Sequence, residues 1–205
     1  MYTIYSMEAK RQNLINVFLE KNKQINLSAI RDEQGVFDKH IRDALEVKNV
    51  FDLQSGMEVC DVWTGGWFPL LPLAIEYPDV HFTGMDSVRK KLDAIWDMAK
   101  QLEIANIDLL WKRAEECKDL QFDVITARAV AYVDKLLPWT KHLLKQGGVW
   151  ILFKQVDEQE RQDLLQLCGE MNLRLEKRYT YKLFDWDIER VIYVVRRLGG
   201  IWKPR

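Results

Sequence analysis

The feature that most constrains the fold of this chain is a series of short apolar runs that begins after Gly56. Each run has the length of a buried strand, and each is followed by enough chain for a helix that crosses back over a sheet. This alternation is typical of a doubly wound parallel sheet with helices on both faces. The predicted strands cover residues 57–62, 80–85, 107–111, 122–126 and 149–153.

Both ends of the chain add elements to this core. The first 50 residues are predicted to form a helical extension, because apolar positions recur at helical spacing. Residues 173–183 and 191–196 have the pattern of two further strands, and the connection at 184–187 is short enough for an antiparallel hairpin. We therefore expect an α/β fold with a seven-stranded, mostly parallel sheet. The two N-terminal helices are predicted at residues 8–23 and 36–50.

Length and composition bound the class of protein. A chain of 205 residues with 48% hydrophobic content suits a single domain over residues 1–205, with the doubly wound core at 57–205. The 30 basic and 31 acidic residues give a net charge of -1, so contacts with nucleic acid require local basic patches. No apolar run approaches the ~20 residues that span a bilayer. We expect a cytoplasmic, monomeric protein without a membrane segment.

The cysteines and the charged runs suggest no metal chemistry. Cys60, Cys117 and Cys168 lie far apart and lack the spacing of a metal site, so we expect reduced structural thiols and no bound metal. The basic run 89–91 and the basic residues near the C-terminus either contact phosphates or form a solvated face. The sequence leaves both interpretations open.

The turn at residues 59–69, VCDVWTGGWFP, is the strongest indication of a ligand site. It ends the first predicted strand, contains Gly65, and precedes a helix predicted to begin near Pro69. In an open α/β sheet the ligand lies beyond the carboxyl ends of the strands, beside such a turn. Asp86 ends the second strand about 20 residues later, where a carboxylate accepts hydrogen bonds from ribose hydroxyls. Asp86 is also positioned to cap the helix that begins near Val88, and both roles are compatible.

Several segments, in order and at matching spacing over residues 22–154, resemble one family. They are INLSAI (25–30), HIRDAL (40–45), WTGGWFPLLPLAI (63–75), DS (86–87), RAEE (113–116) and TARA (126–129). This pattern is similar to that of the bacterial small-subunit ribosomal RNA (guanine-N7) methyltransferases, also called the glucose-inhibited division protein B family. The resemblance implies a class I methyltransferase (Rossmann-like) fold, S-adenosylmethionine as cofactor, and a guanine of 16S ribosomal RNA in the small ribosomal subunit as substrate.

The resemblance also assigns cofactor contacts to particular positions. Carried over residue by residue, they fall at Trp63, Phe68, Ala114, Glu115 and Arg128, in addition to the Gly65 turn and Asp86. The alternative for Arg128 is a hydrogen bond to a guanine edge or a surface ion pair. Guanine N7 carries a lone pair at neutral pH, so attack on a sulfonium methyl group needs alignment and no general base. No residue is therefore assigned a catalytic role.

The chain departs from the family pattern where tryptophans replace glycines, at Trp63 and Trp67. A residue other than glycine in a left-handed conformation costs roughly 1–2 kcal/mol. The two indoles either point away from the pocket, stack on a flat ligand, or fill the cavity. The expected function is an S-adenosylmethionine-dependent rRNA methyltransferase whose activity the indoles impair. The alternatives are a non-catalytic or engineered variant with an occluded pocket, and a nicotinamide-dependent oxidoreductase on the same architecture.

Overall fold

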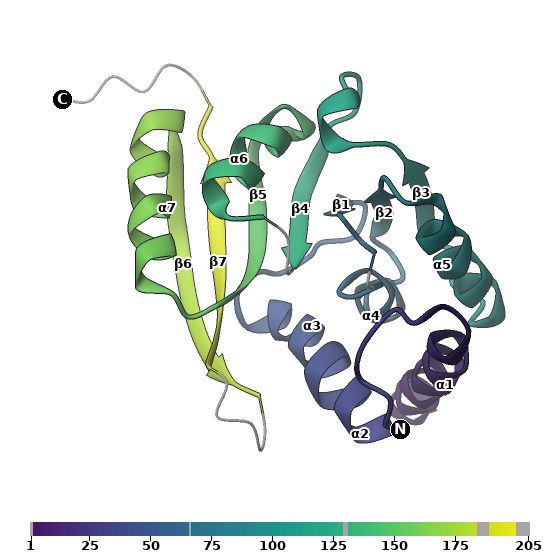
Figure 1. The fold of residues 1–205 in the computed structure, drawn as a ribbon. Helices are drawn as coiled ribbons and strands as arrows, with labels where there is room; N and C mark the ends of the chain where they lie inside the picture. Colours follow the sequence, from purple (N-terminus) through teal and green to yellow (C-terminus); the bar gives the residue numbers. More distant parts are fainter. Residues whose placement is uncertain (1, 66, 129–130, 184–188, 200–205) are drawn as a thin grey trace.

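A computed structural model describes residues 2–65, 67–128, 131–183 and 189–199, and a seven-stranded sheet crosses the described chain (Figure 1). The strand order is β3-β2-β1-β4-β5-β7-β6. Strands β1 to β5 are parallel to one another. Strand β7 is antiparallel to both β5 and β6. The predicted α/β fold and the antiparallel pair after the fifth strand are confirmed. The predicted connection at 184–187 lies outside the described residues.

The strands begin and end close to the apolar runs that predicted them. Their bounds are β1 Glu58–Val62, β2 His81–Asp86, β3 Ile107–Trp111, β4 Phe122–Arg128, β5 Leu144–Gln155, β6 Leu173–Lys182 and β7 Glu189–Arg197. Strand β5 begins earlier than predicted, since polar residues and two glycines separate its first residue, Leu144, from the apolar run that predicted the strand. At Gly148 a Cβ atom would lie 2.8 Å from the Asp123 carbonyl oxygen, so this close approach to β4 requires glycine.

The helices also follow the sequence pattern. They are α1 Tyr2–Ile25, α2 Glu33–Val36, α3 Asp43–Leu45, α4 Leu70–Glu76, α5 Arg89–Gln101, α6 Val133–Thr140 and α7 Glu158–Met171, and a π-helical turn at Phe37–Arg42 joins α2 to α3. The N-terminal helices are therefore present, although the second is divided into short α, π and 3-10 segments. In the described part of the chain no helix combines the length and apolar character that a membrane crossing needs.

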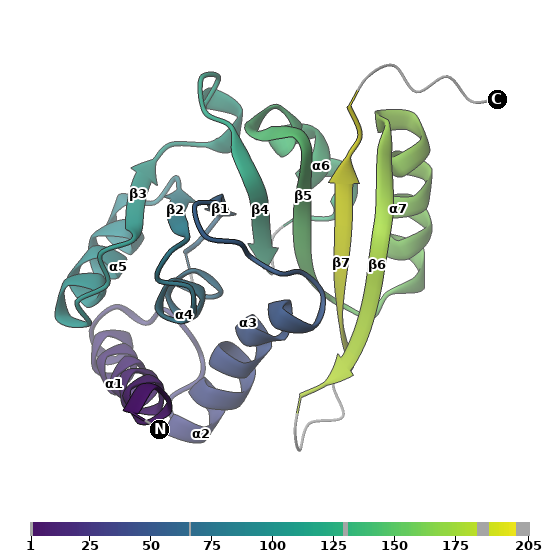
Figure 2. The same ribbon diagram turned by 180° about the vertical axis from the view of Figure 1, so that it is seen from behind.

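Helices cover the two faces of the sheet, as the opposite views in Figures 1 and 2 show. An apolar layer lies on each face. One layer, here called the N-terminal layer, packs α1, α4 and α5 against Val59, Phe82 and Val124 of the sheet. The other layer packs α6 and α7 against the opposite face, around Trp150 and Leu152. Strand side chains alternate between faces, so neighbouring residues of β1 enter different layers.

Candidate nucleoside crevice

The turn after β1 holds two tryptophans in left-handed conformations. The φ angle is +56° at Trp63 and +69° at Trp67. The Thr64 backbone N–H donates to the Met85 carbonyl at 3.0 Å, which ties the turn to the end of β2, and the Trp67 N–H donates to the Thr64 carbonyl at 2.5 Å. This backbone favours glycine at both positions, because a Cβ atom crowds the following carbonyl oxygen when φ is positive.

A crevice lies at the carboxyl ends of β1, β2 and β3, where the sequence placed a ligand. It is lined by Val62, Trp63, Met85, Asp86, Ser87, Lys112, Arg113 and Ala114. The hollow that these described residues line has a volume of about 10 Å³, which is about the size of one water molecule.

Trp63 lies in the lining of this crevice. Its indole is partly buried against the layer that contains α6, and it packs at an angle against Trp139, with ring centroids 5.8 Å apart. The occlusion of the cofactor by this indole stays a prediction.

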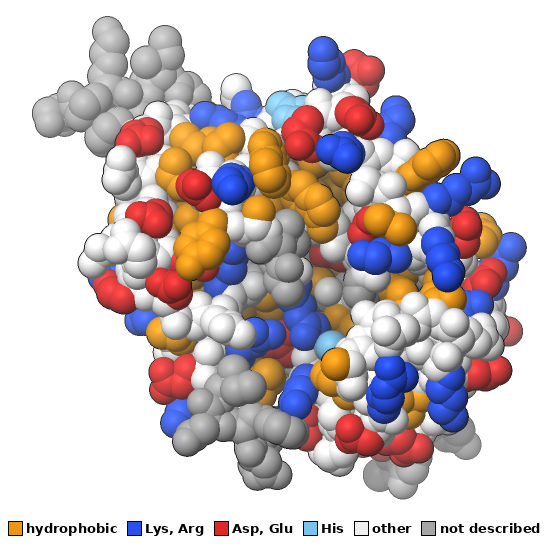
Figure 3. Space-filling model, in the orientation of Figure 1, with side chains coloured by type: hydrophobic (Ala, Val, Ile, Leu, Met, Phe, Trp, Pro, Cys, Tyr) orange, Lys and Arg blue, Asp and Glu red, His pale blue; other side chains and the backbone are white. Residues whose placement is uncertain are grey.

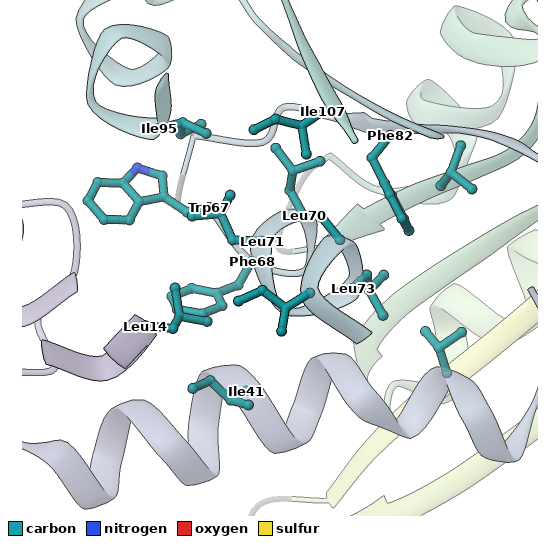
Figure 4. Packing of buried hydrophobic residues seen from close by; sticks show 14 of the residues in the cluster. Leu14, Ile41, Trp67, Phe68, Leu70, Leu71, Leu73, Phe82, Ile95 and Ile107 are labelled. Atoms are coloured by element: carbon teal, nitrogen blue, oxygen red, sulfur yellow. The ribbon is translucent and has the colours of Figure 1, made fainter. Parts of the chain in front are cut away.

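Trp67 and Phe68 lie in the N-terminal layer, among the buried apolar side chains shown in Figure 4. Trp67 has 0% exposure and packs edge-on against Phe18 at 5.2 Å between centroids. Phe68 stacks on His40 at 4.4 Å. Neither residue lines the crevice, so the predicted contact of Phe68 with a cofactor stays a prediction.

Asp86 performs the capping role and also lines the crevice. Its Oδ1 accepts a hydrogen bond from the Val88 N–H at 2.8 Å, which shapes the entry into α5. A Cβ atom at Gly65 would lie 2.7 Å from Asp86 Oδ2 and 2.6 Å from Lys91 Nζ. Gly65 therefore lets a carboxylate and an ammonium group approach the backbone of the turn.

The segment after β3 supplies the opposite wall. Ala114 is buried and lines the crevice, and its carbonyl oxygen lies 3.1 Å from His142 Nε2. Glu115 is exposed and is not among the lining residues. Ser87, Lys112 and Arg113 line the crevice although no role was assigned to them. Their position directly beside Asp86 and Ala114 in the sequence is the signal that could have identified them.

Arg128 lies in a buried polar cluster between the sheet and the N-terminal extension. Its Nε is 3.0 Å from Asp43 Oδ2, and its Nη2 donates to the Lys39 carbonyl at 2.7 Å. Nη2 also lies 3.1 Å from His40 Nδ1. Burial, reinforced by the Arg128 charge, lowers the pKa of His40 to about 3, so the neutral imidazole accepts this bond. Arg128 is neither a surface ion pair nor a lining residue of the crevice.

A second buried acid lies under the turn. Asp61 of β1 is almost fully buried, and its Oδ1 accepts a hydrogen bond from the Thr126 hydroxyl at 2.7 Å. Burial raises the pKa of Asp61 to about 6, and the hydrogen bond from Thr126 opposes that shift. This carboxyl group therefore titrates near pH 6. It belongs to the sheet face against which the N-terminal layer packs.

Comparison with known proteins agrees with this geometry. The family model described as GidB, rRNA small subunit methyltransferase G, matches residues 7–184. The chain belongs to this family. It is 32% identical to ribosomal RNA small subunit methyltransferase G of Lysinibacillus sphaericus over 190 residues, which cover 90% of this chain and 80% of that protein. The protein of the same name from Leuconostoc citreum is 35% identical over 192 residues, with the same coverage.

Solved structures support the same class I methyltransferase fold. A SAM-dependent methyltransferase from Aquifex aeolicus superposes with a TM-score of 0.60 at 16% identity, over 78% of this chain and 92% of that one. The ribosomal protein L11 methylase of Lactobacillus delbrueckii gives a TM-score of 0.60 at 17% identity, over 78% and 79% of the two chains. At these identities the likeness shows the fold.

S-adenosylmethionine is the cofactor that the family and the fold support. The polar groups of the crevice suit it, because the Asp86 carboxylate at the end of β2 can accept hydrogen bonds from ribose hydroxyls. Asp86, Ser87 and Ala114 would hold the nucleoside, and the Trp63 indole belongs to the same lining.

Proposed function

We propose that this chain is a cytoplasmic, monomeric methyltransferase scaffold that acts on guanine N7 of 16S ribosomal RNA, with weakened affinity for S-adenosylmethionine. The observation that carries the proposal is the crevice beside Asp86, in a chain of the methyltransferase G family, with the Trp63 indole in its lining. The relatives are named as small-subunit rRNA methyltransferases, which supports the RNA substrate. The Trp63 ring competes with the cofactor for space in this crevice, which weakens the affinity.

Calorimetric titration with S-adenosylmethionine tests the cofactor part of the proposal. Trp63→Gly is expected to bind at least tenfold more tightly than the parent chain, because it removes the indole from the crevice and relieves the left-handed strain. Trp63→Ala removes the indole but keeps the strained backbone, so it should bind nearly as tightly. Trp96→Leu is the matched control, since this exposed indole on α5 does not line the crevice. Equal affinities for all four proteins would contradict the proposal.

Methyl transfer tests the substrate. Assembled small ribosomal subunits and naked 16S RNA are incubated with labelled S-adenosylmethionine, and the digested RNA is analysed by mass spectrometry. The product expected is N7-methylguanine, formed faster by Trp63→Gly than by the parent chain. Methylation of another atom, or of no RNA by either protein, would contradict the assignment.

The second candidate is a variant that no longer binds the cofactor, and the small crevice volume favours it. The same titration separates the two. An absence of heat or thermal shift at millimolar S-adenosylmethionine for both the parent chain and Trp63→Gly indicates the non-catalytic form.

A further inference from the structure

Large exposed apolar side chains gather at the carboxyl edge of the sheet. Trp111 ends β3 and is 57% exposed, and Tyr132 follows β4 and is 52% exposed. Val88 and Val156, which follow β2 and β5, are also exposed. Because the carboxyl ends of parallel strands meet at one edge, these side chains share that edge with the crevice, Trp111 at the β3 end of the strand order and Tyr132 after β4.

Trp111 is held so that its ring remains accessible. Its indole N–H donates to the Ser87 carbonyl at 3.0 Å, which fixes the edge of the ring. The Arg89 guanidinium lies 5.4 Å from the ring centroid. Beside the ring is a hollow of about 490 Å³, formed by α5 and the edge strand β3. Its residues are Arg89, Leu92, Asp93, Trp96, Asp108, Leu109 and Trp111.

Tyr132 is held in a similar way on the other side. Its hydroxyl donates to Asp157 Oδ2 at 3.1 Å, and Lys154 Nζ lies 5.9 Å from its ring centroid. The ring borders a hollow of about 260 Å³ that also includes Arg190 and Glu160. Lys154 is mostly buried and paired with Glu160 at 2.5 Å, so the cation beside the ring is fixed in place. Each of the two rings thus has an anchored edge, a neighbouring cation and an open hollow.

We propose that Trp111 and Tyr132 are stacking platforms for two unpaired bases of the RNA substrate, one on each side of the crevice. The inference rests on the proposed function, and it adds which RNA the edge accepts: a single strand with exposed base faces. Base stacking on an aromatic ring contributes about 1–3 kcal/mol, and it tolerates any base because each has a π face. A duplex hides those faces, so the platforms discriminate against it.

The charges around the platforms suit a polyanion. Lys112 and Arg113 line the crevice between the two rings, and Arg89 adjoins Trp111. The acidic groups of the larger hollow have nearby partners, since Asp108 Oδ2 lies 2.9 Å from His81 Nε2 and Asp93 Oδ1 lies 3.9 Å from Arg89 Nε. Figure 3 shows basic, acidic and apolar side chains interspersed over one face of the molecule, in keeping with the net charge of -1. Affinity from phosphate contacts alone is therefore modest, and stacking adds to it.

Fluorescence anisotropy with a short labelled single-stranded RNA tests the platforms without requiring cofactor or turnover. Trp111→Leu and Tyr132→Leu are each expected to weaken binding on the order of tenfold, because leucine cannot stack. Tyr132→Phe keeps the ring and loses only the bond to Asp157, so it should bind within about threefold of the parent. Leu165→Ala on α7 is the matched control, since Leu165 is similarly exposed and lies away from the carboxyl edge. Thermal unfolding of each variant identifies loss of fold.

The outcomes separate this inference from the proposed function. If the parent chain binds single-stranded RNA and both leucine variants lose affinity, the platforms are supported even when no methyl transfer is detected. If the leucine variants bind like the parent, or the parent binds a hairpin duplex as tightly as the single strand, or binds no RNA, the inference is overturned. The proposed function is tested separately, because methylation of 16S RNA by the same protein is an independent measurement.

Discussion

The two tryptophans of the β1–α4 turn share a backbone conformation and differ in everything their side chains touch. Trp67 is enclosed by the N-terminal layer on one face of the sheet, beside Phe18 and Phe68. Trp63 packs toward the opposite layer, beside Trp139, and borders the crevice. The left-handed backbone destabilises the fold at both residues, but only at Trp67 does full burial of the indole offset this free energy.

The contrast shows where the turn tolerates a large side chain. A bulky residue at position 67 becomes part of the core, because α1 and α5 surround it. A bulky residue at position 63 lies in the lining of the crevice, because it stands at the carboxyl end of β1. Stability and binding thus respond to different tryptophans, and three substitutions test that separation.

The largest effect on stability is expected from Asp61→Asn, on the face that Trp67 covers. Raising the pKa of Asp61 from 3.8 to about 6 makes the folded state bind a proton more readily than the unfolded state. The parent chain therefore loses stability, relative to this variant, as pH rises from about 4 to 6, and the loss is complete above pH 6. The amide that replaces the carboxylate keeps an acceptor for Thr126, so the variant gains up to roughly 3 kcal/mol at pH 7.

Urea unfolding at pH 4 and pH 7 measures this difference. The two proteins should differ little at pH 4 and most at pH 7. If the difference in unfolding free energy is the same at both pH values, ionisation of Asp61 does not destabilise the folded protein, and the prediction is contradicted.

Trp67→Gly is expected to have a smaller effect of the opposite sign, a loss of stability. Truncating a buried tryptophan costs about 3–5 kcal/mol, and relief of the left-handed backbone returns about 1–2 kcal/mol. The net loss of about 2 kcal/mol is measured by denaturant unfolding. Trp67→Phe is the control, since it keeps apolar volume and removes an indole N–H that has no partner among the described residues. Unchanged stability in the glycine variant would mean that Trp67 contributes nothing to the core.

The smallest change in stability is expected from Trp63→Gly, with a gain of up to about 1 kcal/mol. Relief of strain outweighs the loss of a partly buried ring that packs against Trp139. Trp63→Ala keeps the strain and should gain nothing, so the pair separates strain from packing in the same unfolding measurement. A loss as large as that of Trp67→Gly would remove the contrast between the two positions.

Much of the fold and part of the site followed from local patterns. Strand Ile107–Trp111 has the predicted bounds. Asp86 and Ala114 line the crevice, and their predicted contacts with a cofactor stay predictions. Such residues are predictable because a parallel sheet brings the carboxyl ends of its strands to one edge. The surroundings of Arg128 were not predictable, because its partners Asp43 and His40 come from the distant N-terminal extension.

The sequence by itself determined the alternation of strands and helices, the turn after β1 and the family, since these depend on residue order and spacing. Only the tertiary structure decided that Trp63 lines the crevice and that Trp67 enters the core. The physical reason is that a side chain's direction depends on φ at its own residue and on the volume left by elements far away in the chain. The local sequence does not set the direction of a tryptophan side chain at a glycine position. Packing against Phe18 sets it for Trp67, and packing against Trp139 sets it for Trp63.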